Sequence, residues 1–582
     1  MNHRRGVSRR TILATACLAV SALLQGANPA NPGQRSPGAP AQLPAFRDAA
    51  RAAGLDFVHI NGASDQRFFP EIIGSGGLFL DFDNDGWLDV FLVDGGSIAD
   101  RTLAGRARHR LYRNRGNGTF EDVTGASGIR HRDYGMGTCA GDYDNDGLID
   151  VYVTNVGANL LYRNTGRGRF AEVPNAGGAN PNLWSTSCAF LDIDRDGDLD
   201  LFVTNYVDPM QNRNQFCGFA GPPPVRDYCH PLIYQPLHSV VYRNTGRAFE
   251  DISKSSGVAA LRGNGLGVAV GDVDDNGWPD VFVANDAMPN FLFRNDANGT
   301  FTDVGGAAGV AVAADGKAKA GMGTAFADFN ATGRLGLIVT NHEAEMHSVF
   351  VNVDGAVFSD VTVRSGVGPA TRPFVGFGVV FFDHDNDADL DIAIANGHVM
   401  ANASLLRGGS RFAQRNLLLR NTGGRFQDLK EQAGPGFSIE LVSRALAAGD
   451  VDNDGDLDLL VTNNGAGVNL LLNDGVDRQA ASNGNALLVR VIGTKSNRSG
   501  IGTRLILTTG GRRQLREVQS GSSYLGQNDL RAHFGLGAAS RSESLEVRWP
   551  SGVTEVVKDL PANHVVTLRE GEGIVGRVPF RR

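Results

Sequence analysis

The stretch DFDNDGWLDV, residues 81–90, decides the fold because it joins an acidic loop directly to a strand. Carboxylates stand at positions 1, 3, 5 and 9, as Asp81, Asp83, Asp85 and Asp89. Gly86 permits a sharp turn, and Trp87 offers a backbone carbonyl at position 7. Hard oxygen ligands at this spacing suit Ca²⁺, which takes about 6 to 8 of them in flexible geometry. An EF-hand would need glutamate at position 12, but this chain has Leu92 there, inside the strand.

Acidic loops of this kind recur through the chain. They begin at Asp81, Asp142, Asp192, Asp272, Asp328, Asp383 and Asp450, at spacings of 50 to 80 residues. Each runs into a β segment such as VFLVD or VYVTN, and most are followed by a strand, a Gly/Asn turn and another strand, as in LYRNRGNGTFEDV. This spacing is typical of a four-stranded repeat, and helical periodicity is nearly absent. We therefore expect an all-β repeat fold.

A second motif, F-x-D, precedes every loop, and none follows the last loop. Its copies begin at Phe46, Phe120, Phe170, Phe249, Phe301, Phe358 and Phe426, with glutamate in place of the aspartate in the copy at Phe170. The first copy therefore has no earlier loop to belong to, whereas the last unit lacks its final strand. In a toroidal propeller the N-terminal strand can complete the final blade and hide the open edges. The sequence thus predicts a seven-bladed β-propeller over residues 45–478, closed by its N-terminal strand.

Six of the seven loops are expected to hold calcium, about six ions in all. The ligands expected beyond the first loop are Asp142, Asp144, Asp146, Asp150; Asp192, Asp194, Asp196, Asp200; Asp272, Asp274, Asn276, Asp280; Asp383, Asp385, Asp387, Asp391; and Asp450, Asp452, Asp454, Asp458. The fifth loop has Asn330, Thr332 and Gly336 at ligand positions and is expected to be empty, and the sixth has Ala388 in the glycine slot. Because the loop fills each ligand position and lies at a strand connection, we expect the ions to be structural.

The N-terminus predicts export. Residues 1–27 have a basic head, a short apolar run and small residues at the end, as a cleaved signal peptide does. The SRRTIL segment favours the twin-arginine route over the general one. Residues 28–44 are a Pro/Gly-rich linker, and nothing after them is apolar enough to cross a membrane. We expect a periplasmic or extracellular protein.

The net charge argues against nucleic acid as a partner. The net charge is −8, and without the first 27 residues 51 basic residues face 63 acidic ones, which gives −12. A chain this acidic is not expected to bind nucleic acid through a broad phosphate-facing patch.

Two cysteine pairs lead to different expectations. Cys217 and Cys229 lie in an insertion between the third and fourth loops, and in an exported protein a disulfide between them is expected. With His230 beside them, metal ligation is the alternative. Cys139 and Cys188 lie just before the second and third loops, and we expect them to be buried free thiols.

One histidine-rich stretch could carry other chemistry. NHEAEMHSV contains His342, Glu343, Glu345 and His347, a possible metal or acid/base cluster, but its place after a blade strand favours an ordinary surface loop. His398, in NGHV, has no assigned role. No P-loop, HExxH, GxSxG or dinucleotide motif is present.

These loops resemble the FG-GAP or VCBS repeats of integrin-α-like propellers, and in particular the bacterial relatives of the cartilage acidic protein family. The resemblance is carried by NDAMPNFLFRNDANGTFTDV, YCHPLIYQPLHSVVYRN and FFDHDNDADLDIAIANGHV. The C-terminal segment that begins with GTKSNRSGIGTRLILTTGG and ends with LEVRWPSG is similar to the ASPIC/UnbV domain. The resemblance implies a calcium-binding propeller followed by a small all-β domain at residues 483–572.

Two functions remain open. The first is an exported, non-catalytic module that binds a protein, glycan or matrix ligand over one propeller face. The second is a calcium-structured enzyme, such as a cyclase or hydrolase, with a pocket at the central channel. UnbV-type relatives in natural-product biosynthesis keep the second open, and a pocket converging on His398, His230 or Tyr234 would favour it.

Overall fold

The computed structural model describes residues 45–130, 133–209, 215–219, 221–406, 410–473 and 484–581. The predicted signal peptide, 1–27, and linker, 28–44, lie outside the described residues. Within them, helices are short connections of at most five residues: α1 (Arg101–Ala104), α2 (Thr124–Ser127), α3 (Gly305–Ala308), α4 (Val367–Thr371), α5 (Ala403–Leu406) and six single 3₁₀ turns. None of them is long and apolar enough to cross a membrane. The prediction of an all-β chain is confirmed.

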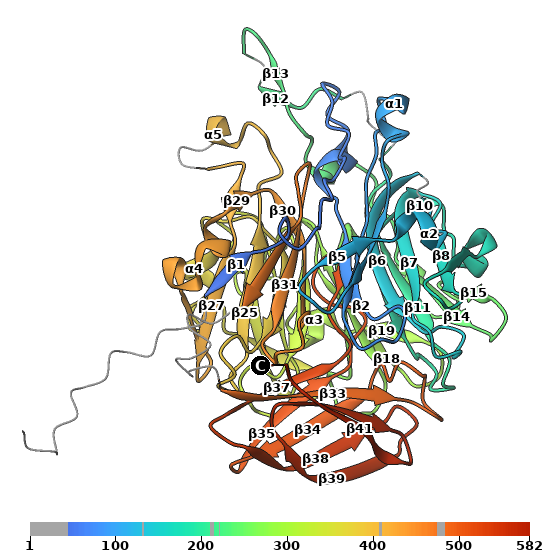
Figure 1. Ribbon diagram of the computed structural model, residues 1–582. Helices are drawn as coiled ribbons and strands as arrows, with labels where there is room; N and C mark the ends of the chain where they lie inside the picture. Colours follow the sequence, from blue (N-terminus) through green and yellow to red (C-terminus); the bar gives the residue numbers. More distant parts are fainter. Residues whose placement is uncertain are drawn as a thin grey trace, which may run out of the picture. The chain divides into compact units, whose positions relative to one another are not determined.

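The repeats fold as four-stranded antiparallel units, seven of them among the described residues (Figure 1). The first three are β2 (Gly77–Leu80), β3 (Asp89–Leu92), β4 (Arg110–Asn114) and β5 (Phe120–Asp122); β6 (Tyr134–Gly141), β7 (Asp150–Gly157), β8 (Leu160–Asn164) and β9 (Phe170–Glu172); and β10 (Leu183–Leu191), β11 (Asp200–Asn205), β14 (Val240–Asn244) and β15 (Phe249–Asp251). A short pairing of β10 with β7 joins the second unit to the third.

The remaining units have the same order of strands. They are β16 (Gly265–Gly271), β17 (Asp280–Asn285), β18 (Phe291–Asn295) and β19 (Phe301–Asp303); β20 (Thr324–Ala327), β21 (Gly336–Val339), β22 (Ser348–Asp354) and β23 (Val357–Asp360); β24 (Gly376–Phe382), β25 (Asp391–Asn396), β27 (Leu417–Thr422) and β28 (Arg425–Asp428); and β30 (Ser443–Gly449), β31 (Asp458–Asn463) and β32 (Asn469–Asn473). The N-terminal strand β1 (Phe46–Asp48) pairs with β32, Phe46 opposite Asn473, and supplies the fourth strand of the last unit.

The first strand of each unit contacts the first strand of the next. The contacts run from β2 through β6, β10, β16, β20, β24 and β30, and back to β2. Apolar side chains fill the space between neighbouring sheets: Phe79 and Val90 of the first unit pack against Ala447 and Leu460 of the last. Since burying one such side chain contributes roughly 1.5–3 kcal/mol, these inter-sheet layers are the main core of the repeats.

One asparagine in each unit ties it to the loop of the unit before. The side-chain amide of Asn164 donates to the Phe82 carbonyl at 2.8 Å, and each equivalent asparagine repeats this bond. The other pairs are Asn244 to Tyr143, Asn295 to Ile193, Asn352 to Val273, Asn421 to Phe329, Asn473 to His384 and Asn114 to Val451. The last pair joins the first unit to the loop of the seventh, so the series has no open end.

The C-terminal part forms two further sheets, drawn in orange to red in Figure 1. One has the order β37 (Ala532–Gly537), β33 (Asn485–Ile492), β40 (His564–Arg569), β41 (Gly573–Pro579), and the other β35 (Arg512–Glu517), β34 (Arg504–Thr509), β38 (Arg541–Arg548), β39 (Thr554–Pro561). Short pairs occur elsewhere: β12 (Gly218–Phe219) with β13 (Val225–Arg226), and β26 (Gln414–Arg415) with β29 (Glu440–Leu441).

Residues 520–528, here called the plug segment, run from β35 toward β37 and contact the first strand of all seven units. They include β36 (Gly526–Gln527), which pairs with β2. The other contacts are hydrogen bonds that involve Ala140, Phe190, Val270, Thr324, Val379 and Leu446. The plug segment therefore occupies the space that the seven first strands surround.

Candidate metal centres

The first aspartate of each loop holds the turn together through backbone amides. The Asp81 carboxylate accepts hydrogen bonds from the N–H groups of Asp85, at 3.0 Å, and Gly86, at 3.2 Å. The same pair of bonds recurs at Asp142, Asp272, Asp328, Asp383 and Asp450. Gly86 has a φ of +86°, a left-handed conformation that side chains disfavour, which explains the glycine at position 6.

The aspartate at position 9 is bound from two directions. Asp89 accepts the N–H of Phe82 on one oxygen, at 3.1 Å, and that of Asn114 on the other, at 2.8 Å. Equivalent pairs of bonds hold Asp150, Asp200, Asp280, Asp391 and Asp458. This carboxylate therefore fastens the loop to the third strand of its unit, in addition to any part it has in binding an ion.

The aspartate at position 3 has an unmet bonding capacity in several loops. In Asp83, Asp194, Asp274 and Asp385 the Oδ1 atom is buried and has no hydrogen-bond partner among the described residues. The other oxygen of Asp83 lies 2.9 Å from Arg113 Nε, so one arginine neutralises part of the charge. A buried carboxylate oxygen left without a partner is costly, and a cation beside it would remove that cost.

The pKa values show the electrostatic cost of packing these acids together. Burial, helped by the neighbouring carboxylates, raises the pKa of Asp192 to about 7 and that of Asp454 to about 9. Burial raises the pKa of Asp150 to about 9 as well. Groups of three ligand atoms within 4.8 Å of one another occur in these loops, for example at Asp142, Asp144 and Asp146. A divalent cation would offset both the desolvation and the mutual repulsion.

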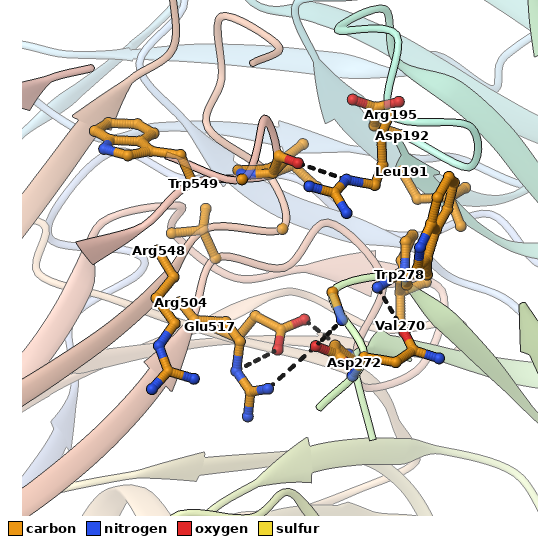
Figure 2. A pocket seen from close by; sticks show the side chains of 18 of the residues that line it. Leu191, Asp192, Arg195, Val270, Asp272, Trp278, Arg504, Glu517, Arg548 and Trp549 are labelled. Atoms are coloured by element: carbon orange, nitrogen blue, oxygen red, sulfur yellow. Dashed lines mark hydrogen bonds and ion pairs between the residues drawn. The ribbon is translucent and has the colours of Figure 1, made fainter. Parts of the chain in front are cut away.

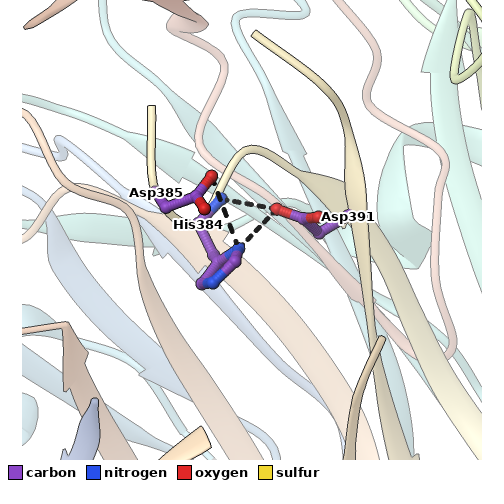
Figure 3. A group of neighbouring side chains, drawn as sticks. All are labelled: His384, Asp385 and Asp391. Carbon is purple, nitrogen blue, oxygen red and sulfur yellow. Dashed lines mark hydrogen bonds and ion pairs between the residues drawn. The ribbon is translucent and has the colours of Figure 1, made fainter. Parts of the chain in front are cut away.

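The fifth and sixth loops depart from the pattern. In the fifth, the Asp328 carboxylate accepts from Thr332, whose hydroxyl also lies 3.1 Å from Asn330 Oδ1, and Gly336 begins the next strand in place of an aspartate. The polar side chains of the fifth loop thus hydrogen-bond within the loop. In the sixth, His384 Nδ1 lies 2.5 Å from Asp391 Oδ2 and 3.8 Å from Asp385 Oδ1 (Figure 3). Position 2 of the other loops holds an apolar or tyrosine side chain.

Arginines of the C-terminal sheets reach the loops. Arg504 of β34 lies 3.2 Å from Asp272 and 2.6 Å from Asp275, and Glu517 of β35 accepts the Asp272 N–H at 3.2 Å. Figure 2 shows Arg504, Asp272 and Glu517 among the residues that line a cavity of about 260 Å³, together with Trp278. The sequence did not predict this contact between the loops and the C-terminal sheets, since the partners are more than 200 residues apart.

The cysteines form two disulfides. Cys217 and Cys229 are joined, with 5.2 Å between their Cα atoms. Cys139 and Cys188 are also joined, with 5.8 Å between Cα atoms, so the prediction of free thiols is wrong. These two occupy β6 and β10, which are neighbours, and their separation of 49 residues is close to one repeat. The repeat spacing was therefore the signal that pointed to the pair.

The histidine-rich stretch is more buried than a surface loop. Glu343 is 8% and His347 0% exposed, so the surface prediction is wrong for both. The His347 ring fills space left open by Gly376, where a Cβ atom would lie 2.2 Å from Nε2. His398 Nε2 lies 3.8 Å from Glu343 Oε1, and the Ser410 hydroxyl donates to the same carboxylate at 2.8 Å.

The other two residues of the hypothetical enzyme pocket lie in different contacts. His230 is exposed and accepts the Leu232 N–H at 3.3 Å. Tyr234 stacks on Phe69, with 5.0 Å between ring centroids. His398 instead contacts His342, Glu343 and the backbone of Met400.

Comparison with known proteins identifies both parts of the chain. The FG-GAP-like repeat model matches residues 81–153, 142–203 and 272–339, and the ASPIC and UnbV model matches residues 493–575. Residues 81–203 and 272–339 thus match FG-GAP-like repeats, and residues 493–575 match the ASPIC and UnbV domain.

Curated relatives agree with this resemblance. Cartilage acidic protein 1 of Homo sapiens is 31% identical over 309 residues, which cover 52% of this chain and 43% of that protein. The Mus musculus protein of that name is 30% identical over 309 residues, covering 52% and 44%. The chain thus matches less than half the length of these relatives.

The solved structures that resemble this chain are only distantly similar to it. A lectin from Burkholderia pseudomallei is 11% identical, with a TM-score of 0.42, and the match covers 69% of this chain and 97% of the lectin. A likeness this distant does not extend carbohydrate binding to this chain.

Proposed function

We propose that this chain is an exported, calcium-binding seven-bladed β-propeller that binds a protein, glycan or matrix ligand and catalyses no reaction. The observation that carries the calcium part is the buried oxygen without a hydrogen-bond partner at position 3 of Asp83, Asp194, Asp274 and Asp385, within the part of the chain that the structure describes. The donors around it are carboxylate, amide and backbone oxygens, the set that Ca²⁺ prefers over softer metals.

The proposed ligands are the aspartates of six loops, with Asn276 in the fourth. The fifth loop fits a cation poorly because Thr332 bonds both to the Asp328 carboxylate and to Asn330. Bound calcium would offset part of the carboxylates' charge and hold each strand connection rigid. Since calcium binds the folded loop and not the unfolded chain, it acts as a folding ligand.

The closed series of asparagine bonds and the cyclic contacts of the first strands support a seven-bladed ring. Each sheet uses its neighbour on either side to bury its faces, as propeller blades do. The pairing of β1 with β32 supports closure by the N-terminal strand.

A non-catalytic role is supported by how the centre of the repeats is filled. Residues of the plug segment bond to the strands around it, and Arg444 is buried there beside Phe377, with its guanidinium carbon 3.9 Å from the ring centroid. A substrate pocket at the central channel, which the enzyme alternative needs, would require these groups to leave. The binding surface is instead expected on an exposed face of the repeats or where they meet the C-terminal sheets.

Elemental analysis of the purified mature chain tests the proposal. We expect about six calcium ions per chain, and a melting temperature that falls after chelation and recovers when calcium is added back. At a hundredfold excess over Kd, one site stabilises by about 2.7 kcal/mol, so several sites would give a large shift. No metal in the purified protein, together with a melting temperature that chelation leaves unchanged, would overturn it.

A further inference from the structure

A second cavity lies between the first two aspartate loops and the C-terminal sheets. Its volume is about 490 Å³, within the roughly 300–1,000 Å³ of small-molecule sites. Its walls come from β2 and the first, second and seventh loops on one side, and from β33, β40 and β41 on the other. It is separate from the smaller cavity of Figure 2, which lies beside the third and fourth loops.

Four arginines line this cavity with donors that the described residues do not use. Arg498 is exposed and its side chain makes no hydrogen bond or ion pair with them. Arg569 is ion-paired with Glu572 through Nη1 at 3.2 Å, but its Nε has no hydrogen-bond partner among them. Arg490 donates to Asn84 at 2.9 Å, and Arg581 lies over the Trp87 ring at 4.4 Å. Each guanidinium presents five N–H donors, so most of this capacity is free for a ligand.

The smaller cavity offers a useful contrast. There Arg504 is paired with Asp272 and Asp275, and Arg195 donates to the Pro550 carbonyl at 2.7 Å. Both arginines are thus held by protein groups, although Arg504 Nε itself has no hydrogen-bond partner among the described residues. Of the two, the larger cavity therefore combines ligand-sized volume with an exposed arginine, Arg498, whose side chain the described residues leave without a partner.

The acids of the larger cavity are the proposed calcium ligands. Asp81, Asp85 and Asp142 line it, while Asp529 is already paired with Arg531 at 2.6 Å. Without calcium these three carboxylates oppose an anion near the arginines. One calcium ion in each of the first two loops would add two positive charges against four carboxylates, and so would reduce the repulsion that an anion meets near the arginines.

The rest of the lining indicates the body of the ligand. Leu530, Val565 and Val578 provide apolar wall, and Thr567 adds a hydroxyl. Guanidinium groups bind carboxylate and sulfate through paired hydrogen bonds. A small ring-shaped ligand would match this lining if it carried an acid group on one side and both apolar and hydroxyl surface on the other.

We propose that this cavity binds an acidic sugar, carboxylated or sulfated, and that it does so in the calcium-loaded protein. The inference rests on the proposed calcium binding and places one ligand site at the junction of the two parts of the chain. Arg498 and Arg569 bind the acid group, and the apolar wall contacts the ring.

Calorimetric titration of the mature chain tests this with three probes: digalacturonate, lactose 3′-sulfate and neutral lactose. We expect at least one acidic probe to bind in calcium and lactose to bind at least about tenfold more weakly, a difference of about 1.4 kcal/mol. The two acidic probes tell carboxylate from sulfate recognition. Lactose binding as tightly as the acidic probes, or no binding of either acidic probe, would overturn the inference.

Variants locate the site. Arg498→Ala combined with Arg569→Ala should weaken acidic-probe binding at least about tenfold, whereas Arg513→Ala, an exposed arginine of β35 paired with Glu546, should leave it unchanged. Asp83→Asn, which does not line the cavity, should weaken binding through loss of calcium, and Asp194→Asn in the third loop should not. Unchanged affinity in the double variant would overturn the site.

Calcium content measured in the same samples separates the two proposals. Calcium-loaded protein that ignores both acidic probes contradicts the sugar site and leaves the calcium proposal intact. Protein without calcium contradicts the proposed function itself. Equally tight acidic-probe binding in calcium and in chelator would contradict the dependence of this cavity's charge on calcium.

Discussion

Asn114 and Val451 lie 337 residues apart in the chain, yet the Asn114 side-chain amide donates to the Val451 carbonyl at 2.8 Å. The six equivalent bonds join units that are consecutive in the sequence, such as Asn164 to Phe82. Of these seven bonds, only that of Asn114 links the first unit to the seventh loop. It therefore forms only when the ends of the repeat array meet.

Replacing Asn114 by alanine tests closure of the ring in solution. The change removes the donor and leaves the Val451 carbonyl buried without it, which should cost about 1–3 kcal/mol of unfolding free energy. Asn164→Ala is the matched control, since both asparagines are at most 3% exposed and make the same bonds within their own units. We expect equal losses in chemical denaturation. A much smaller loss for Asn114→Ala would contradict a closed ring.

Single-loop variants test which loops bind calcium. Asp194→Asn should lower the melting temperature in calcium but have little effect in chelator, because the stabilisation it removes is that of the ion. Asn330→Ala in the fifth loop is the control, and its effect should be the same in both solutions. An effect of Asp194→Asn that persists undiminished in chelator would mean that the aspartate is structural without an ion.

The sequence predicted the repeats and the acidic loops because their signal is local. The carboxylate spacing around Asp81 and the apolar run after it lie within one short stretch. The bond between Asn114 and the neighbouring unit was not predicted, because an asparagine before a glycine-containing turn is normally explained by the turn itself. The recurrence of this asparagine in every unit was nevertheless visible in the sequence. The plug segment was missed because its contacts are distant: Ala140 and Gln527, which share a hydrogen bond, are 387 residues apart.

Stability should depend on pH in opposite ways with and without calcium. Burial raises the pKa of Asp142 to about 6 and the pKa values of Asp192 and Asp450 to about 7. The unfolded value is near 3.9, so the folded protein binds these protons more tightly. In chelator, stability should therefore be greatest near pH 4 and fall as the pH rises to about 7.

With calcium present, the ion occupies the deprotonated carboxylates and competes with protons. Stability should then be kept at neutral pH and fall on acidification, as calcium is released. Melting temperatures across this pH range, in calcium and in chelator, test both curves. A chelated protein whose melting temperature rises steadily from pH 4 to pH 7 would contradict the raised pKa values.

The two disulfides should differ in what they contribute. The Cys139–Cys188 link closes a loop of 49 residues, and the Cys217–Cys229 link one of 12. The chain-entropy model gives about 4 and about 3 kcal/mol for loops of these lengths. Cys139→Ala with Cys188→Ala should lower the melting temperature more than Cys217→Ala with Cys229→Ala. A larger fall in melting temperature for the Cys217 and Cys229 variant would show that the Cys139–Cys188 disulfide is not formed.

The plug segment should make the repeats and the C-terminal sheets unfold together. Tyr524 is fully buried, its hydroxyl donates to the Ile73 carbonyl at 3.1 Å, and its ring lies 5.0 Å from that of Phe377. Tyr524→Ala should cost about 3–5 kcal/mol through the cavity it leaves, and Tyr524→Phe about 1 kcal/mol through the lost hydrogen bond. Both should lower a single cooperative transition in calorimetry, because the tyrosine is held by the repeats while its chain belongs to the C-terminal part. A variant that melts in two steps, with the repeats at their original temperature, would show that the plug segment does not stabilise the ring.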